Sequence, residues 1–269
     1  MLATVSANDF GYITIDDLAE RNLRTLETLS RLERFEGHLF NWYDLNTLEP
    51  LRPRYVSAVD SGNLVASLWT FETSCNELAG RPLLDDAALR GIADTLNVLR
   101  QIAPNQKEAE RPLAFRRLEG LTRDQPANLE EIILRIRAAR QLAQDLLLHY
   151  RGQETDPRTY WTQQISKQVA AWNGVIDKYL RPVEILMSPP AQLMSLGEAT
   201  HESRREALAA TFSLRNIAIE GIAGLVPLLP FYQRRDDPEI SRDVREWLDF
   251  LIREVDSSRR NASEQLAQL

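Results

Sequence analysis

Residues 127–151 read ANLEEIILRIRAARQLAQDLLLHYR, and this stretch decides the expected fold. Apolar residues recur in it every three or four positions, between arginine, glutamate and glutamine, which predicts an amphipathic helix with one buried face. Similar patterns occupy residues 157–187, 198–229 and 238–268. All four are longer than the ~11–12 residues of an average helix, so we expect proline to kink or split some of them.

Prolines interrupt these long patterns at four places. They are Pro182, the Pro189-Pro190 pair, Pro227 and Pro230. The last stretch, residues 253–269, is polar and alternates in charge. Such a pattern is typical of a solvated helix face or a frayed helix end.

The amino-terminal part also predicts helices. The first begins at Thr14, a capping residue, and Asp16 and Asp17 complement the positive end of the helix dipole. We expect Gly37 to end this helix, because glycine is favoured just after a helix.

A second helix is expected to begin after the N-cap pair Asp60-Ser61 and to end at Gly80. A third spans about residues 85–101, and a short helical segment lies near residues 113–121. Successive helices joined by short loops favour antiparallel hairpins. The predicted fold class is therefore all-α, with helical hairpins arranged as a bundle or as an incomplete six-hairpin (α/α) toroid.

Composition and charge narrow the function classes. The chain has 269 residues, of which 43% are hydrophobic and 26% charged, and its formal net charge is −7. Its few arginine pairs have acids nearby, which argues against nucleic acid as a partner. The single cysteine, Cys75, cannot form an internal disulfide, so a reducing compartment is expected. Without a signal-peptide pattern or an apolar stretch of ~18 residues, we expect a cytoplasmic chain that does not itself insert into a membrane.

Between Gly37 and Asn63 the sequence changes character and reads GHLFNWYDLNTLEPLRPRYVSAVDSGN. Pro50 and Pro53 exclude a continuous helix, so this segment is a loop held by the helices on either side. It is rich in residues that suit a sugar: His38, Asn41, Trp42, Tyr43, Asp44, Tyr55, Asp60 and Asn63. Aromatic faces can stack on the C–H face of a pyranose ring, and polar side chains can bind its hydroxyl groups.

A structural role accounts for the same loop residues. A long ordered loop needs buried aromatics and side chains that satisfy its own backbone, so residues 41–44 can be an anchor and Asp60 an N-cap. Core packing is the expected role of Trp69, Trp161, Trp172 and Trp247. His149 and His201 lack partners at metal-ligand spacing, so we expect them to be surface or capping residues, and we expect no metal and no cofactor. Cys75 is expected to be a buried small apolar residue.

Three strings of this loop resemble a signature of the cyclic β-1,2-glucan synthases, which are very large bacterial inner-membrane proteins. The strings are GHLFNWYD at 37–44, TLEPL at 47–51 and RYVSAVDSGNL at 54–64. The family pattern, GHFYNWYDTRTLxPLxPxYVSTVDSGNL, lies at the start of a glycoamylase-like middle segment. The chain departs from it mildly, at Leu39-Phe40, Leu45-Asn46 and Ala58.

Residues 89–96, LRGIADTL, also look like the family, so the resemblance covers about a quarter of the chain. It suggests two regions: residues 1–103 with family-like helices and the loop 37–63, and residues 104–269 with long helices that pack on them.

The resemblance implies a role in glucan transfer or cyclisation. In these synthases a membrane-embedded transferase elongates the glucan from UDP-glucose, the six-hairpin middle segment cyclises it, and a phosphorylase-like segment trims it. The chain resembles neither the transferase nor the phosphorylase, and the family's catalytic carboxylates are expected in sequence beyond its end. We expect it to be inactive alone and to supply a β-glucan-binding loop and scaffold to a larger synthase at the inner membrane. The implied substrate-binding residues are His38, Asn41, Trp42, Tyr43, Asp44, Tyr55, Ser57, Asp60, Ser61 and Asn63.

Two other interpretations stay open. Asp44 and Asp60 are the only carboxylates flanked by suitable aromatics, and a glycosidase pair needs two carboxyls about 5–10 Å apart, one of them kept protonated. Alternatively, the chain is a noncatalytic helical interaction module. Its apolar face would lie at residues 217–231, IAIEGIAGLVPLLPF, a segment that should be buried within the chain or against another one.

Overall fold

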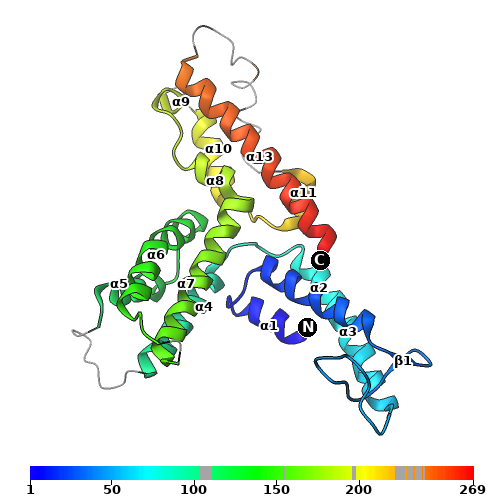
Figure 1. Cartoon of the computed structure of the whole chain (residues 1–269). Coiled ribbons are helices and arrows are strands. Elements are labelled where there is room, and N and C mark those ends of the chain that lie inside the picture. The colour runs from blue at the N-terminus through cyan, green and yellow to red at the C-terminus, as the bar shows by residue number, and fades with distance from the viewer. Residues whose placement is uncertain are drawn as a thin grey trace.

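The structure is a computed structural model that describes residues 1–102, 111–153, 155–195, 198–221, 228, 233, 238 and 240–269. The described residues are mainly helical, which confirms the all-α prediction (Figure 1). The helices are α1 (Leu2–Asp9), α2 (Ile15–Arg31), α3 (Ala58–Leu78), α4 (Asp86–Ile102), α5 (Leu113–Arg123), α6 (Leu129–His149), α7 (Pro157–Val175), α8 (Arg181–Leu186), α9 (Ala191–Ser195), α10 (Glu198–Ala209), α11 (Leu214–Glu220) and α13 (Arg242–Gln268). A π-helical turn, η2 (Ile176–Leu180), joins α7 to α8, and strands β1 (Arg34–Phe35) and β2 (His38–Leu39) form a small antiparallel sheet.

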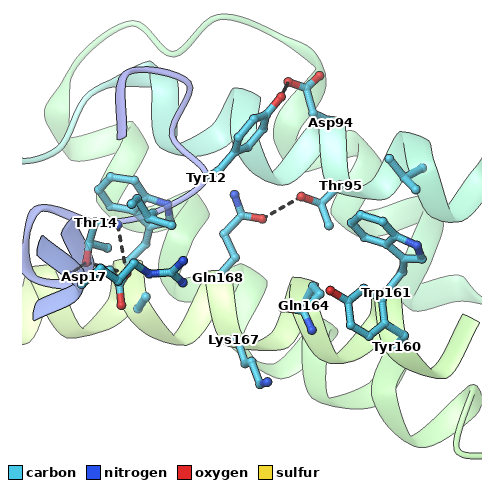
Figure 2. Close-up of a pocket in the computed structure, with 15 residues that line it drawn as sticks. Tyr12, Thr14, Asp17, Asp94, Thr95, Tyr160, Trp161, Gln164, Lys167 and Gln168 are labelled. Carbon is cyan, nitrogen blue, oxygen red and sulfur yellow. Dashed lines mark hydrogen bonds between the residues drawn. The ribbon is translucent and has the colours of Figure 1, made fainter. Parts of the chain in front are cut away.

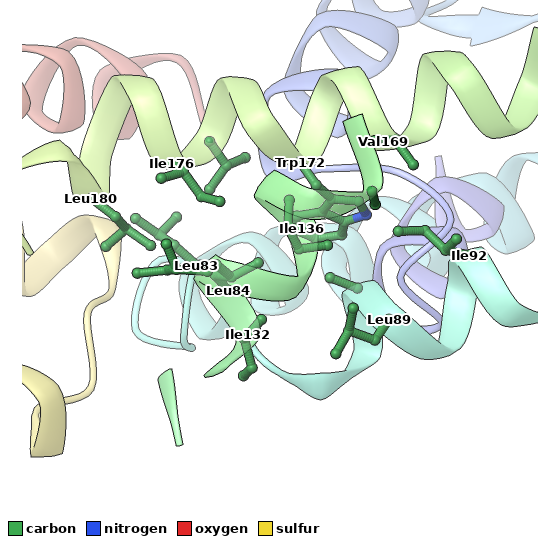
Figure 3. Packing of buried hydrophobic residues seen from close by; sticks show 14 of the residues in the cluster. Leu83, Leu84, Leu89, Ile92, Ile132, Ile136, Val169, Trp172, Ile176 and Leu180 are labelled. Atoms are coloured by element: carbon green, nitrogen blue, oxygen red, sulfur yellow. The ribbon is translucent and has the colours of Figure 1, made fainter. Parts of the chain in front are cut away.

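Helices α4 to α7 form a bundle. Each helix contacts the next along the chain, and α7 returns to pack on α4. Figure 3 shows the apolar side chains that meet between them, among them Leu89, Ile92, Ile132, Ile136, Val169 and Trp172. Fully burying a leucine or isoleucine side chain contributes about 1.5–3 kcal/mol, so this cluster holds the bundle together. In this part of the chain the helices therefore form a bundle, one of the two arrangements that the sequence left open.

The turn between α1 and α2 is fixed against this bundle at Gly11. The side-chain nitrogens of Gln168 and Trp172, both from α7, donate hydrogen bonds of 2.9 and 3.2 Å to the carbonyl oxygen of Gly11. Gly91 of α4 lies so close that a Cβ atom there would be 2.3 Å from the same oxygen. The amino-terminal turn thus packs backbone to backbone on α4, and this contact positions α2.

Helix α2 begins where the sequence predicts. Thr14 Oγ1 accepts a hydrogen bond of 3.2 Å from the backbone nitrogen of Asp17, and the carboxylate of Asp17 accepts one of 3.0 Å from the backbone nitrogen of Thr14. This reciprocal capping box satisfies two amides that a helix start leaves unpaired. The helices expected at residues 85–101 and 113–121 are also present, as α4 and α5.

The interruption expected at Pro182 takes the form of the π-helical turn η2, after which Pro182 lies in the first turn of α8. Proline cannot donate to the carbonyl four residues before it, here that of Lys178. The side-chain amide of Asn261, from α13, donates a 2.9 Å hydrogen bond to that carbonyl. A side chain therefore donates to the carbonyl that Pro182 cannot serve.

The carboxyl-terminal helices differ from their sequence patterns in two respects. The pattern at 198–229 breaks between α10 and α11, where Ser213 caps α11 by accepting a hydrogen bond from the backbone nitrogen of Asn216. Pro227 and Pro230 lie outside the described residues. The final stretch is neither a wholly solvated face nor a frayed end, because α13 continues to Gln268 and buries Ala262 and Gln265. Helix α13 packs along α11, α8 and η2 (Figure 1).

Candidate functional site

A tight β-hairpin opens the predicted binding segment. Phe35 of β1 pairs with His38 of β2, and the two residues between them, Glu36 and Gly37, have φ values of 51° and 85°. Two consecutive positive φ values suit a type I′ hairpin turn, which favours glycine at its second position. The prediction that Gly37 ends the first helix is wrong, because α2 has already ended at Arg31.

Helix α3 begins earlier than the sequence indicates. Its N-cap is Ser57, whose Oγ accepts a 3.1 Å hydrogen bond from the backbone nitrogen of Asp60. Asp60 and Ser61 therefore lie in the first turn of the helix, and the prediction that they cap it is wrong. The side chain of Asp60 is not used for capping, although its charge suits the positive end of the helix.

Asn41 ties the loop to the start of α3. Its Nδ2 donates a 2.6 Å hydrogen bond to Oδ2 of Asp60, and its Oδ1 accepts one of 3.0 Å from the backbone nitrogen of Ser57. The backbone nitrogen of Asn41 also donates to the carbonyl of Tyr55 at 2.9 Å. The side chain of Asn41 thereby holds Ser57 and Asp60, and its backbone holds Tyr55.

His38 joins the same network from the hairpin. Its Nδ1 lies 2.9 Å from Oγ of Ser61, and that hydroxyl donates a 2.8 Å hydrogen bond to the carbonyl of Ser57. With the Ser61 proton directed to that carbonyl, the serine oxygen can accept from the tautomer of His38 that carries its proton on Nδ1. The second ring nitrogen, Nε2, then remains an acceptor for a ligand when the ring is neutral.

Tyr43 anchors the loop from inside. Its hydroxyl donates a 2.7 Å hydrogen bond to the carbonyl of Glu33 and accepts one of 2.8 Å from the backbone nitrogen of Phe40. Its ring meets the buried ring of Phe40 edge to face, with centroids 6.3 Å apart. Arg54 lies over the same phenylalanine and pairs with Glu33 at 2.8 Å. This geometry gives Tyr43 a structural role.

Asp44 also serves the loop. Its Oδ1 accepts hydrogen bonds of 2.8 and 2.9 Å from the backbone nitrogens of Asn46 and Thr47. Those two amides, Thr47 first, hold the pKa of the Asp44 carboxyl below its ordinary value. A glycosidase acid needs a raised pKa, so the geometry does not favour Asp44 as the acid of a pair with Asp60.

Trp42 and Tyr55 form an exposed aromatic pair. Their rings stack with centroids 6.0 Å apart and an interplanar angle of 26°. The two residues are 55% and 52% exposed. A stacked pair that leaves this much ring surface in water can receive the apolar face of a sugar.

The hairpin, α3 and the carboxyl-terminal half of α2 enclose an open groove of about 1040 Å³. This part of the molecule lies at the opposite side of the view from α5 and α6 in Figure 1. Four residues of the predicted set line the groove: His38, Asn41, Asp60 and Ser61. Apolar lining residues include Leu26, Leu29, Leu64, Val65 and Trp69. We call this cavity the α2–α3 groove.

Trp69 is the residue of the groove that sequence reasoning missed. The prediction that it packs in the core is wrong, because it is 68% exposed. Val65, one helical turn earlier and 45% exposed, lies beside it in the groove wall. Asn63 is exposed on α3 and does not line the groove.

The other single-residue predictions have mixed outcomes. Trp172 is buried as expected, while Trp161 and Trp247 are half-buried and pack against the core clusters. Cys75 is buried, and burial raises the pKa of its thiol. Both His149 and His201 are exposed, as predicted.

The groove offers both donors and acceptors of hydrogen bonds. Asp60 Oδ1 and His38 Nε2 can accept from hydroxyl groups, and the second amide hydrogen of Asn41 can donate. Among the described residues, no group of histidine, cysteine and carboxylate side chains is arranged to hold a metal ion. The arrangement therefore suits recognition of a polyhydroxylated ligand by hydrogen bonds and by stacking on Trp69.

The chain is similar in sequence to part of a much larger known protein. The chain is 35% identical over 147 residues to cyclic beta-(1,2)-glucan synthase NdvB of Rhizobium meliloti (strain 1021). The matched region is 53% of this chain and 5% of that protein, so the chain spans a small part of its relative's length. No family model matches the chain. The resemblance to the cyclic β-1,2-glucan synthases is thus confirmed.

None of the helices that the structure describes combines the length and the hydropathy needed to cross a lipid bilayer.

Proposed function

We propose that the chain binds a β-glucan oligosaccharide in the α2–α3 groove and acts as a binding and scaffolding part of a larger glucan synthase or cyclase. One observation carries the proposal. The groove brings Trp69 together with the hydrogen-bonded set of Asn41, Asp60, His38 and Ser61. The four polar residues belong to the loop signature that resembles that of the cyclic β-1,2-glucan synthases.

The polar network suits sugar hydroxyls because it is already ordered. Asn41 and Asp60 hold each other at 2.6 Å, so a ligand does not have to order them on binding. Neighbouring hydroxyls can donate to Asp60 Oδ1 and accept from Asn41 Nδ2, while the C–H face of the ring stacks on Trp69. Preorganised groups of this kind retain affinity that would otherwise be lost to side-chain entropy.

The same geometry supports a role without catalysis by this chain alone. Both predicted carboxylates have partners in the loop, Asp44 in its own turn and Asp60 with Asn41. The proposal assigns the reacting carboxylates, and attachment to the bacterial inner membrane, to other segments of the larger protein. Trp42 and Tyr55, stacked and exposed, extend the binding surface outside the groove.

Calorimetric titration of the 269-residue chain with linear β-1,2-glucan tests the proposal. We expect saturable heat at up to millimolar sugar, and weaker binding of β-1,4- and α-1,4-linked glucan oligosaccharides of equal length. No heat with any glucan would contradict the proposal. Equal heats for all three linkages would contradict the assignment to β-1,2-glucan.

One observation favours the second interpretation, a noncatalytic interaction module. Helix α3 exposes three apolar side chains, Val59, Val65 and Trp69, which are 72%, 45% and 68% exposed, and exposed apolar surface often marks a contact with a partner. The face predicted for this role, at 217–231, fits less well. Ile217 and Leu228 are buried and Ile219 is 65% exposed, whereas Ile222, Leu225 and Leu229 lie outside the described residues. Two results together would favour the interaction module. Light scattering would show self-association that Val59→Glu abolishes, and calorimetry would show no glucan binding.

A further inference from the structure

A second pocket lies on a different part of the chain, between α2, α4 and α7. Its volume is about 640 Å³, within the range of roughly 300–1,000 Å³ typical of small-molecule sites. Figure 2 shows Thr14 and Asp17 at one end of this pocket and Tyr160 and Trp161 at the other. We call it the α2–α4–α7 pocket.

Aromatic rings form one end of the pocket. Tyr160 and Trp161 pack edge to face with centroids 5.3 Å apart. Tyr160 is 50% exposed and Trp161 is half-buried, so both rings keep surface available while α7 fixes their positions. An edge-to-face pair presents two ring surfaces at a right angle, which forms a corner for a ring-shaped ligand.

The floor of the pocket is polar and internally satisfied. Thr95 Oγ1 donates a 3.0 Å hydrogen bond to Oε1 of Gln168, and Nε2 of Gln168 donates to the carbonyl of Gly11 at 2.9 Å. Both side chains are buried. Because their hydrogen bonds are made within the protein, they shape a rigid floor and need no ligand.

The rim, in contrast, carries groups that can still bind. Asp94 accepts a 3.0 Å hydrogen bond from the hydroxyl of Tyr12 on Oδ2, which leaves Oδ1 available. Lys167, Gln164 and Arg21 also line the pocket, and the described part of the chain gives these three side chains no hydrogen-bond or ion-pair partner. The rim thus offers acceptors and donors around an aromatic corner.

We propose that the α2–α4–α7 pocket is a second carbohydrate-binding site, which holds another stretch of glucan in addition to the one in the α2–α3 groove. That the sugar is a glucan rests on the proposed function. The sugar class follows from the pocket: two cations, Arg21 and Lys167, are balanced by two carboxylates, Asp17 and Asp94, so no excess charge selects an ionic ligand. Hydroxyl groups, which both donate and accept, match such a mixed rim.

Fluorine NMR can examine both sites in one sample of the full chain. The chain has five tryptophans. Trp161 lines the α2–α4–α7 pocket, and Trp69 lines the α2–α3 groove. Trp247 lies on α13 and packs against buried apolar residues outside both sites. After 5-fluorotryptophan labelling, and assignment by single Trp→Phe variants, linear β-1,2-glucan is titrated to millimolar concentration. We expect saturable shifts of the Trp161 and Trp69 signals and an unchanged Trp247 signal.

The two proposals fail in different ways in this experiment. A moving Trp69 signal with a static Trp161 signal would overturn the second site and leave the groove intact. The reverse result would uphold the second site and overturn the groove. If neither signal moves, both proposals fail.

Variants of Tyr160 show whether the Trp161 signal shifts because glucan binds in this pocket or because binding elsewhere changes the conformation around Trp161. Tyr160→Ala should abolish the ligand-induced shift of Trp161 and leave that of Trp69, and Tyr160→Phe should preserve both because the ring face remains. Tyr160 is half exposed, so its truncation leaves the buried core in place. A Trp161 shift that survives Tyr160→Ala at unchanged glucan concentration would contradict a site in this pocket.

Discussion

The side chain of Asn41 donates a 2.6 Å hydrogen bond to the carboxylate of Asp60, across the junction between the loop and the first turn of α3. The same amide accepts a hydrogen bond of 3.0 Å from the backbone of Ser57, the N-cap of that helix. The conformation of the loop, the start of α3 and the wall of the α2–α3 groove therefore all depend on Asn41. Changes at Asn41 should affect stability and glucan binding together.

Asn41→Ala removes both contacts of this amide. We expect the free energy of unfolding to fall by about 1–2 kcal/mol, the usual worth of such hydrogen bonds at a partly exposed site, and glucan affinity to fall as well. Urea unfolding and calorimetry measure the two effects. Asn63→Ala is the matched control, because Asn63 is exposed and does not line the groove. Equal effects of the two substitutions would contradict the role given to Asn41.

Gly11→Ala should damage the contact between the amino-terminal turn and α4. A Cβ atom at this position would lie 1.9 Å from the carbonyl oxygen of Ala87, and φ is +72°. We expect a loss of roughly 3 kcal/mol or more in unfolding free energy, because the backbone must separate and a strained conformation is added. Thermal unfolding followed by circular dichroism gives the measurement.

Gly120→Ala serves as the control for that substitution. Gly120 lies in α5, and apart from its own turn of helix no atom of the described residues lies within 4 Å of an added Cβ. Alanine there should stabilise the chain by about 0.5–1 kcal/mol, since it favours the helix. If Gly11→Ala changed the unfolding free energy by no more than Gly120→Ala does, the turn would not pack on α4 as described.

Glu184 should make stability depend on pH. Burial raises the pKa of its carboxyl, but hydrogen bonds from Arg137 and Arg181 outweigh burial and hold the pKa below its ordinary value. A carboxyl whose folded pKa is depressed contributes stability above its unfolded pKa of about 4.3 and loses it as the pH falls through the folded value. Glu184→Gln should therefore cost about 1–3 kcal/mol at pH 7, and the difference should shrink below about pH 4.

The control for Glu184 is Glu20→Gln, which removes an ion pair with Arg24 on the surface of α2. Both side chains of that pair are more than half exposed, so its loss should cost at most about 1 kcal/mol. Urea unfolding of the three proteins between pH 7 and pH 3 tests the prediction. The prediction would be contradicted if the unfolding free energies of Glu184→Gln and the unchanged chain differed by the same amount at every pH in this range.

Local sequence signals predicted the helices well but the groove only in part. The cap at Thr14 could be predicted because both partners lie within four residues. Trp69 could have been placed correctly, since it falls outside the apolar stripe of Leu64, Leu68, Phe71, Cys75 and Leu78 and shares its own face with Val65. Its size and position within a helix instead suggested the core.

The α2–α4–α7 pocket could not be predicted from sequence. Tyr12, in the turn between α1 and α2, and Asp94 of α4 are hydrogen-bonded but 82 positions apart, and Trp161 comes from α7. No local pattern records that these side chains converge, because the convergence depends on how α4 and α7 pack. The same holds for Asn261, which supplies the donor that Pro182 lacks.

The central claim is that glucan binds in the groove against Trp69. The most direct test is the calorimetric affinity for linear β-1,2-glucan of the unchanged chain, Trp69→Ala and Leu148→Ala. Leu148 is 65% exposed on α6 and controls for loss of an exposed apolar side chain. We predict at least about tenfold weaker binding for Trp69→Ala, as for other aromatic residues central to a binding site, and no change for Leu148→Ala. Equal affinities of all three proteins would contradict the account.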